Sequence, residues 1–544
     1  MLKKKEIAGN IFDKLNSCYV VDRFFQKRER KMLHKPLVIR SRWLLMAALI
    51  YLYIPICLFL WTWTRLLVAV PAIAVSLFTV YRLFNRFAAA NTERDVQITP
   101  GMLLFLIVFL FAVAVICGWG DFMLQSADWY KHNALLQDMT YHSWPVFYQD
   151  AVTPSMLTYY IGQYLVPAAV GKLFCSAQVT EIVFMLWGVV GLLLVSLNLF
   201  SGLTQDLTPP RQLVILLLLL LFNGCLPLAQ QLYRIVAVDG TNYNPFQWQW
   251  MFQLFGENPC LLQYRSNFVD LRWVMPQCIS IWLVLSVWWK HRDSVEFFLP
   301  LMLPCMLNGA ISFLGLAVMA VLSVAVTWLI EKTRLSDLAR KVFSVDNILS
   351  LVFLAVPLLV YFSGNLFSEK PAYAGFSRQY VPLRLYVCFV LGEFGLYALL
   401  VWKKHRKNSL FWSAILLLSI LPFFKVGYFN DLVMSASIPA MFLMMICILD
   451  HLLDNWKSWQ SVCLVLLLTI AAIYPLQEMN SVRTNGFGRD LGGSHCVSSL
   501  EQYSDLETEE GESWKYNYYT YDLDNSLFLR WFSRDSFGSS TQRP

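Results

Sequence analysis

Long apolar segments separated by short polar connections occupy most of the chain from residue 43 onward. A helix needs roughly 20 apolar residues to cross the hydrocarbon core of a bilayer. The clearest candidate spans are 43–63, 65–82, 102–119, 178–200, 212–230, 277–290, 311–330, 346–363, 384–402, 409–424, 432–450 and 459–475. Shorter or more polar candidates are 156–173 and 296–308. The pattern predicts an all-α polytopic membrane protein with about 12 to 14 transmembrane helices.

The composition favours the same class of protein. Of the 544 residues, 57% are hydrophobic and 15% are charged, whereas a soluble protein carries about a quarter charged residues. The 12 cysteines form no CxxC pair, so neither a zinc site nor a thioredoxin-like site is predicted. No P-loop, GxSxG or HExxH motif occurs, and nucleotide-driven pumping by this chain is therefore not predicted.

The placement of the charges predicts the topology. Lys3, Lys4 and Lys5, followed by the basic residues of 23–42, precede the first span. By the positive-inside rule, the N-terminus is cytoplasmic, and we interpret this arm as a topogenic and lipid-binding segment rather than a nucleic-acid-binding one. Further basic inner loops are 290–292, 332–341 and 403–407. The segments predicted to face outward are 120–155, 231–276, 364–383, 425–431 and 476–544.

The predicted spans and topology divide the chain into three regions. Residues 1–42 form a basic cytoplasmic arm, 43–475 form the transmembrane domain, and 476–544 form an extracytoplasmic tail. The tail is too short for a robust independent domain. If 156–173, 178–200 and 212–230 all crossed the membrane, segment 231–276 would face the cytoplasm. One of the three therefore does not cross fully, and the polar and Tyr-rich 156–173 is the first candidate, with the choice among them left open by the sequence.

The first outer segment holds the densest group of candidate residues. Helix-favouring residues in 123–139 predict an amphipathic helix lying on the membrane surface, which ends at Trp144-Pro145. The candidates are Asp121, Asp128, Lys131, His132, Asn133 and Asp138. A carboxylate here could act as a general base, and Asp128 with His132, at i and i+4, could hold a divalent metal ion. The alternative is a polar face that is merely solvated.

Two further groups of polar residues lie in later outer segments. Arg265, Arg272 and Gln277 follow Gln247, Trp248 and Trp250, a combination that suits either a phosphate and sugar site or an aromatic membrane belt. The last group is Lys370, Arg378, Arg384, Lys425, Asn430 and Asp431. Its cations could bind an anionic ligand or pair with the acidic cluster of the tail between Glu501 and Glu512.

Two cysteines, Cys260 and Cys496, lie clearly within predicted outer segments. The extracytoplasmic compartment permits disulfides, and a bridge between these residues would fix the tail over segment 231–276. Free thiols at both positions are the alternative, and we favour it because a disulfide requires the two Cα atoms to lie within about 7 Å of each other.

Several short motifs resemble those of a known superfamily. DWYKHNALLQD at 128–138, WPV at 144–146, the Tyr-rich segment after Pro154, and NDLVMSASIP at 430–439 are similar to the class C (GT-C) membrane glycosyltransferases, in an uncharacterised bacterial branch. This superfamily includes protein O-mannosyltransferases and the aminoarabinose transferases of lipid A. The chain departs from the pattern because its first outer segment has no adjacent Asp-Glu pair, two extra spans precede that segment, and Ser435 stands where an arginine is expected.

The resemblance implies a GT-C-like fold in the bacterial inner (cell) membrane, with the C-terminus outside. It implies a polyprenyl-phosphate-linked sugar as donor, and a glycan, lipid or protein as acceptor. The acidic residue of the first outer loop would be Asp128, with Asp121 as the competing position. Arg265, Arg272, Gln277, Arg378, Lys425 and Asp431 would then contribute to substrate binding, together with Lys131, His132, Asn133 and Asp138.

Two other functions compete with a glycosyltransferase. One is a transporter or flippase of a lipid-linked saccharide, and the other is a non-catalytic subunit of an envelope complex. A transferase requires Asp128 and the later cations to converge on one outward site, whereas a transporter requires charged residues near the bilayer midplane. Glu181 and Glu393 are among the few charges inside the predicted spans.

The predicted topology can be tested by chemical labelling. Single cysteines introduced into 120–155, 231–276 and 476–544 of a cysteine-free variant should react with an impermeant thiol reagent in intact spheroplasts, because all three segments are predicted to face outward. Cysteines in the basic arm should react only after lysis. Labelling of 231–276 only after lysis would exclude a shared outer site.

Overall fold

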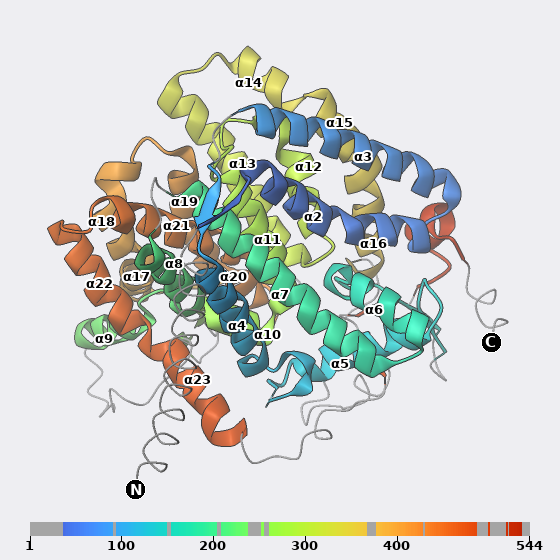
Figure 1. Cartoon of the computed structure of the whole chain (residues 1–544), viewed down its shortest axis with the longest axis horizontal. Coiled ribbons are helices and arrows are strands. Elements are labelled where there is room, and N and C mark those ends of the chain that lie inside the picture. The colour runs from blue at the N-terminus through green and yellow to red at the C-terminus, as the bar shows by residue number, and fades with distance from the viewer. Residues whose placement is uncertain are drawn as a thin grey trace, which may run out of the picture.

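The structure is a computed structural model that describes residues 36–90, 94–123, 125–149, 154–203, 208–237, 252–254, 260–366, 377–427, 430–486, 499–500, 518–520 and 522–535. Helices dominate these residues, and the few strands are only two or three residues long. The described residues therefore form an all-α architecture with many apolar helices, as predicted for a multi-pass membrane protein (Figure 1).

Among the described residues, eight helices are long and apolar enough to cross a bilayer. Three lie in the first half of the chain, namely α2 (Ser41–Trp63), α3 (Leu66–Ala89) and α7 (Ala177–Gly202). The others are α13 (Ala310–Glu331), α15 to α16 (Val345–Gly364), α17 to α18 (Leu383–His405), α20 to α21 (Asp431–Asp454) and α22 to α23 (Trp459–Arg483). A ninth is possible if α8 (Pro209–Leu221) and α9 (Leu226–Ala237), which meet at a bend of 54°, form one span.

Fewer full-length spans therefore occur among the described residues than the about 12 to 14 predicted from hydropathy. Four of the predicted spans fold as apolar helices of only 10–17 residues, which are α4 (Pro100–Ile116), α11 (Met275–Trp288), Val295–Cys305 and Ser409–Phe423. Hydropathy measures how apolar a segment is and does not reveal where its helix breaks. Segment 156–173 is a similar case, because its helix α6 (Gly162–Phe174) has 13 residues and is not among the candidate spans.

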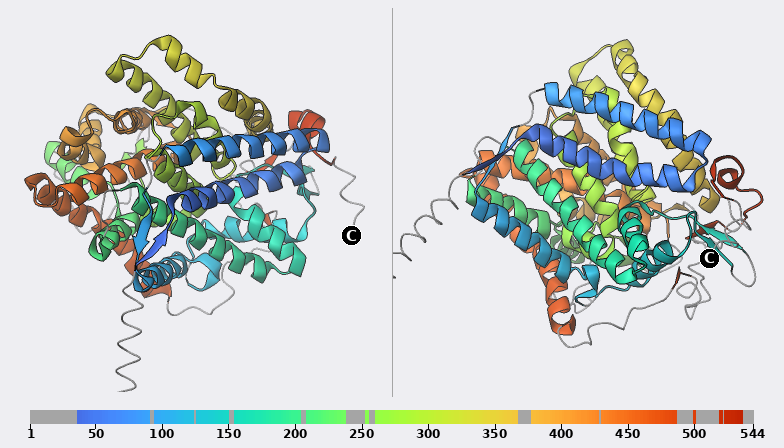
Figure 2. Two further views of the ribbon diagram at one scale, coloured as in Figure 1. Left: turned by 45° about the horizontal axis from the view of Figure 1, so that its top comes forward. Right: turned by 45° about the vertical axis from the view of Figure 1, so that its right-hand side comes forward.

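The helices run between two ends of the molecule, and the contacts at the two ends of α2 define them. At its first residue, the Ser41 amide donates to Asp95 Oδ1 at 2.9 Å, next to the antiparallel pair β1 (Leu37–Ile39) and β2 (Val96–Ile98). Just beyond its last residue, Thr64 bridges to Ser533 of the tail. We call these the basic end and the tail end. The right-hand view of Figure 2 shows α2, α3, α4 and α7 running side by side between them.

Segments predicted to share one side of the membrane lie at the same end. At the basic end, Lys290 Nζ donates to Asn198 Oδ1 at 3.1 Å, and the His405 ring lies 5.9 Å from that of Trp289. At the tail end, a three-stranded sheet joins β3 (Phe147–Tyr148), β4 (Ser155–Leu157) and β9 (Tyr519–Thr520). Of the predicted inner loops, 290–292 and 403–407 thus lie at one end, and parts of the predicted outer segments 120–155 and 476–544 lie together at the other.

The centre of the bundle is formed by α11 and α21 (Ile438–Asp454). Every residue of α11 from Met275 to Trp288 is buried, and the Trp282 and Phe442 rings of the two helices stack with centroids 5.1 Å apart. Helices α3, α13 and α22 (Trp459–Ala471) lie at the periphery and expose apolar side chains such as Leu67, Val321 and Leu466. Exposed apolar helices of this kind are typical of a surface that faces lipid.

The described parts of the tail are built into the bundle. Strand β9 pairs with β4, and Arg65 Nε donates to the Ser533 carbonyl at 2.8 Å. The Phe528 ring is fully buried against Phe59 and Tyr361. The predicted pairing of Cys260 and Cys496 lies outside the described side chains.

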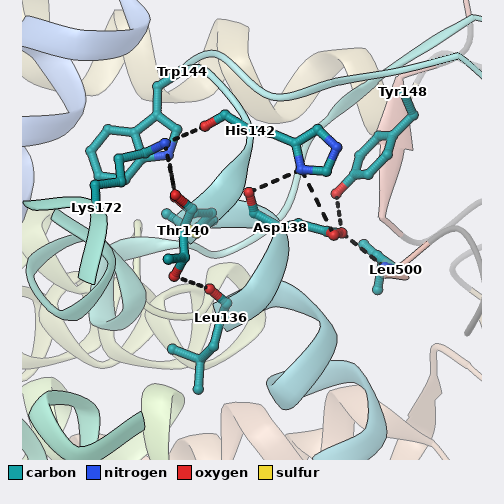
Figure 3. Close-up of polar contacts among 9 residues, drawn as sticks. Leu136, Asp138, Thr140, His142, Trp144, Tyr148, Lys172 and Leu500 are labelled. Carbon is teal, nitrogen blue, oxygen red and sulfur yellow. Dashed lines mark hydrogen bonds and ion pairs between the residues drawn. The ribbon is translucent and has the colours of Figure 1, made fainter. Parts of the chain in front are cut away.

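The prediction of an amphipathic surface helix in the first outer segment is wrong. Helix α5 (Trp129–Tyr141) packs against α6 and α7, and nine of its 13 residues are buried. Its polar side chains bond to other parts of the chain, as Figure 3 shows for Asp138, whose carboxylate accepts hydrogen bonds from the Tyr148 hydroxyl and the Leu500 amide, both at 2.8 Å. An alternation of polar and apolar residues does not distinguish a solvated face from one that meets protein partners.

Asp138→Asn should weaken the attachment of the tail. The asparagine NH2 group is itself a donor, and it would face the Tyr148 hydroxyl and the Leu500 amide, which donate to the carboxylate in wild type. We expect a loss of about 1–3 kcal/mol, the usual cost of an unsatisfied buried polar group. Faster protease release of a C-terminal tag would report it, with Asp293→Asn, at an exposed position, as the control. Equal release rates in the two variants would show that the Asp138 contacts do not hold the tail.

Candidate functional site

Asp128 and Lys131 form a partly exposed ion pair at the start of α5. Asp128 is the N-cap residue of the helix, and its carboxylate lies 3.0 Å from Lys131 Nζ, with 32% and 11% of the two side chains exposed. Burial raises the pKa of Asp128, but Lys131, His132 and Arg265 lower it by more, so that the net pKa falls below its usual value. Asp128 is therefore ionised at neutral pH.

His132 is held by protein partners rather than open to a ligand. Its Nδ1 contacts the Tyr164 hydroxyl, and its Nε2 lies 3.1 Å from the Trp273 carbonyl. Burial, assisted by Lys131, lowers the pKa of His132 to about 4, so the ring is neutral at physiological pH. The next residue, Asn133, donates to Gln125 Oε1 at 2.8 Å. Both side chains fix the position of α5.

The metal site predicted at Asp128 and His132 gains no support from this geometry, because both ring nitrogens of His132 already have partners. Within the described part of the chain, no three His, Cys, Asp or Glu side chains are grouped to hold a metal ion.

The two other carboxylates of the first outer segment lie apart from this ion pair. Asp138 anchors the tail through Leu500 (Figure 3). Asp121 ends the short helix η1 (Trp119–Asp121) in a left-handed backbone conformation with φ 59°, and its charge acts on Glu181 of α7.

Arg265 connects α10 (Asn267–Trp273) with α20 (Asp431–Ala436). Its Nε lies 3.0 Å from Asp270 Oδ1, and the two side chains are only 8% and 4% exposed. Another guanidinium nitrogen donates to Ser435 Oγ at 3.0 Å. Burial raises the pKa of Asp270 to about 7 against the opposing effect of Arg265. The guanidinium group of Arg265 thus lies beside Ser435, the position in the motif 430–439 at which an arginine was expected.

Four of the predicted charged residues converge although they come from three separate segments. Asp128, Lys131 and Arg265 all act electrostatically on Asp431, the first residue of α20. Both carboxylates are accessible to solvent. We call Asp128, Lys131, Arg265 and Asp431 the charge cluster.

The remaining predicted residues have other surroundings. Arg272 Nε lies 3.1 Å from Glu478 Oε1, and the Gln277 amide donates to the Tyr160 hydroxyl at 3.1 Å. Arg378 and Lys425 lie on the paired strands β7 (Ser377–Arg378) and β8 (Phe424–Lys425), while an Arg384 nitrogen donates to the Val236 carbonyl at 3.4 Å. Lys370, Gln247, Trp248 and Trp250 lie outside the described residues.

Two important carboxylates were missed by the sequence analysis. Asp270 lies between Arg265 and Arg272 in the sequence, and a carboxylate flanked by two arginines in an apolar region was the signal for it. Glu478, the partner of Arg272, lies 206 residues away in the chain, and no local pattern connects the two.

Comparisons of the chain with protein-family models, with curated proteins and with solved structures find no match. A function therefore has to be inferred from the fold and from the contacts of its own side chains.

The neutral state of His132 predicts a pH effect on stability. Because its pKa is about 4 in the folded protein and 6.5 ordinarily, the unfolded chain takes up the proton first, and stability falls as the pH falls from about 6.5 to 4. The shift corresponds to about 3 kcal/mol. Relative to wild type, His132→Gln should therefore be less destabilised at pH 4 than at pH 7, as measured by thermal unfolding in detergent.

Asp270 acts in the opposite direction over the same range, because its raised pKa makes the folded state lose stability as the pH rises from 3.8 to about 7. The comparison of wild type with His132→Gln at each pH cancels this contribution. If the difference in thermal stability between wild type and His132→Gln does not change with pH, the pKa of His132 is not lowered by burial in the folded protein.

Proposed function

We propose that the protein is a membrane glycosyltransferase that moves a sugar from a polyprenyl-phosphate-linked donor to an envelope acceptor on the extracytoplasmic face of the bacterial inner membrane. The observation that carries the proposal is the convergence of Asp128, Lys131, Arg265 and Asp431 in the charge cluster. A transferase needs such a convergence, and an interfacial belt of snorkelling side chains does not.

The charges suit the two halves of the reaction. An ionised Asp128 can take the proton of an acceptor hydroxyl as that oxygen attacks the anomeric carbon. The bond between this carbon and the phosphate oxygen breaks, and the leaving polyprenyl phosphate gains negative charge. Lys131 and Arg265 stabilise this charge. Asp431 can accept hydrogen bonds from sugar hydroxyl groups.

The surroundings of the cluster suit a ligand that is part charged and part lipid. The polar residues lie beside a bundle whose outer helices are apolar, so a polyprenyl chain can remain in the bilayer while its phosphate and sugar reach the charge cluster. The proposal uses no metal ion, although a divalent cation bound with the substrate phosphate would assist the same leaving group.

A transporter or flippase of a lipid-linked saccharide is the second candidate function, and one observation favours it. Glu393 is a fully buried carboxyl group within a candidate span, and ionisable groups at such depth mark transport pathways. The two functions differ in whether the glycosidic bond to the phosphate is broken.

Asp128→Asn should reduce sugar transfer at least about 100-fold, the range expected for loss of a general base, while thermal stability stays close to that of wild type because the ion pair is partly exposed. The assay incubates purified protein with radiolabelled polyprenyl-phosphate sugars and envelope extract. Asp121→Asn, at the competing position, serves as the matched control and should keep its activity.

Full activity in Asp128→Asn would remove this residue from the mechanism. Movement of the labelled lipid across proteoliposomes, without release of the sugar from its phosphate, would overturn the transferase in favour of the transporter.

A further inference from the structure

A carboxyl group without a partner lies in the middle of one candidate span. Glu393 belongs to η6 (Leu391–Gly395), the π-helical turn that joins α17 (Leu383–Val390) to α18 (Leu396–His405). Its side chain is 0% exposed, and among the described residues neither carboxyl oxygen has a hydrogen-bond partner. Ionisable side chains inside a membrane span are rare, and π-helical turns often occur at functional sites.

Glu393 lies against the break between α8 and α9. The first helix ends at Leu221 and the second begins at Leu226. The Cys225 amide donates to the Gly392 carbonyl at 3.1 Å, and the Tyr397 hydroxyl donates to the Asn223 carbonyl at 3.3 Å. A Cβ atom at Gly224 would overlap Glu393 Oε2, so the carboxyl group rests directly on the unwound backbone.

The break contains a second unsatisfied acceptor. Asn223 Oδ1 is buried and, within the described part of the chain, has no partner. Two carboxyl oxygens and an amide oxygen are thus buried in this region without a donor. A proton on Glu393 removes the charge and supplies a donor.

In the part of the chain that the structure describes, the titratable groups found to interact with Glu393 carry no positive charge. They are Cys225 at the break, Tyr264 before α10, Tyr397 on the next turn of its own helix and Tyr474 of α23 (Ile473–Gly486). All are thiols or phenols, which are neutral when protonated.

We propose that Glu393 is an intramembrane proton-binding site whose occupancy controls the break between α8 and α9. With the proton bound, the neutral carboxyl group packs on Gly224 and the break stays closed. When the proton leaves, the carboxylate has to reach water, because the described residues offer it no hydrogen-bond partner where it lies, and its separation from Gly224 opens the break. The proposal does not depend on glycosyl transfer, and a proton-coupled movement of α9 would serve either candidate function.

Cys225 provides a native reporter, because its thiol is buried within the break. The rate of its alkylation by N-ethylmaleimide, measured by mass spectrometry of its peptide, reports opening. Between about pH 6 and 9, the rate in wild type should rise at least about tenfold more than in Glu393→Gln, which mimics the protonated group and keeps the Cys225 thiol in the sequence. The intrinsic reactivity of Cys225 in each protein is measured after denaturation at the same pH values, and the native rates are divided by it. Parallel pH profiles in the two proteins would overturn the proposal.

Two further variants keep the test decisive. Glu181→Gln, which removes another carboxyl group within a span, should give the wild-type profile. Gly224→Ala should displace the Glu393 carboxyl group and make Cys225 react quickly at every pH. This variant is compared directly with wild type, so the test remains available even if Glu393→Gln does not fold. A wild-type profile in Gly224→Ala, or protection of Cys225 that depends on added sodium rather than pH, would contradict a proton site.

Discussion

Hydrocarbon cannot hydrogen-bond to a polar side chain, and this constraint explains most of the contacts that hold the bundle together. A buried polar group has to find its partner within the chain. In this protein many of those partners are remote in sequence. Arg265 and Ser435 are 170 residues apart, Arg272 and Glu478 are 206 apart, and Asp138 and Leu500 are 362 apart. Each pair fixes two helices or loops whose apolar surfaces alone would allow them to slide.

Against this background, the charge cluster differs from the other polar contacts. Most buried polar groups near it are engaged with other parts of the chain, as His132 is with Tyr164 and the Trp273 carbonyl. These contacts hold α5 and α10 in place, and they leave Asp128 and Asp431 accessible. The rigid surroundings favour a preorganised site, in which charges are positioned before a substrate arrives.

The sequence predicted the class of protein and the positions of the apolar segments well, because both depend on local composition. It also placed the loops at Lys290 and Lys403 in one set, and these two loops lie at the same end of the bundle. The number of full-length spans was overestimated, because hydropathy does not register a helix break such as the one in 212–230, although the turn-forming Asn223-Gly224 pair was a local signal for it. The burial of α5 was missed because its partners lie far away in the chain.

The same limit applies to the candidate site. Asp128, Lys131, Arg265 and Asp431 were all named from charge and context, but their convergence could not be derived, since it depends on how three distant segments pack. His132 and Asp138 were assigned to chemistry because polar residues on a helix look alike whether they bind a ligand or a neighbouring loop. Their burial separates the two cases.

The position of β9 has a consequence for how the protein is made. Strand β4 belongs to the first third of the chain, yet its edge is completed by Tyr519 and Thr520, and Arg65 binds the carbonyl of Ser533. The eight candidate spans found among the described residues are all synthesised before Tyr519, Thr520 and Ser533. Insertion into the membrane and completion of the tail end are therefore separate events, and a nascent chain passes through a stage in which every helix is in place but the tail end is still open.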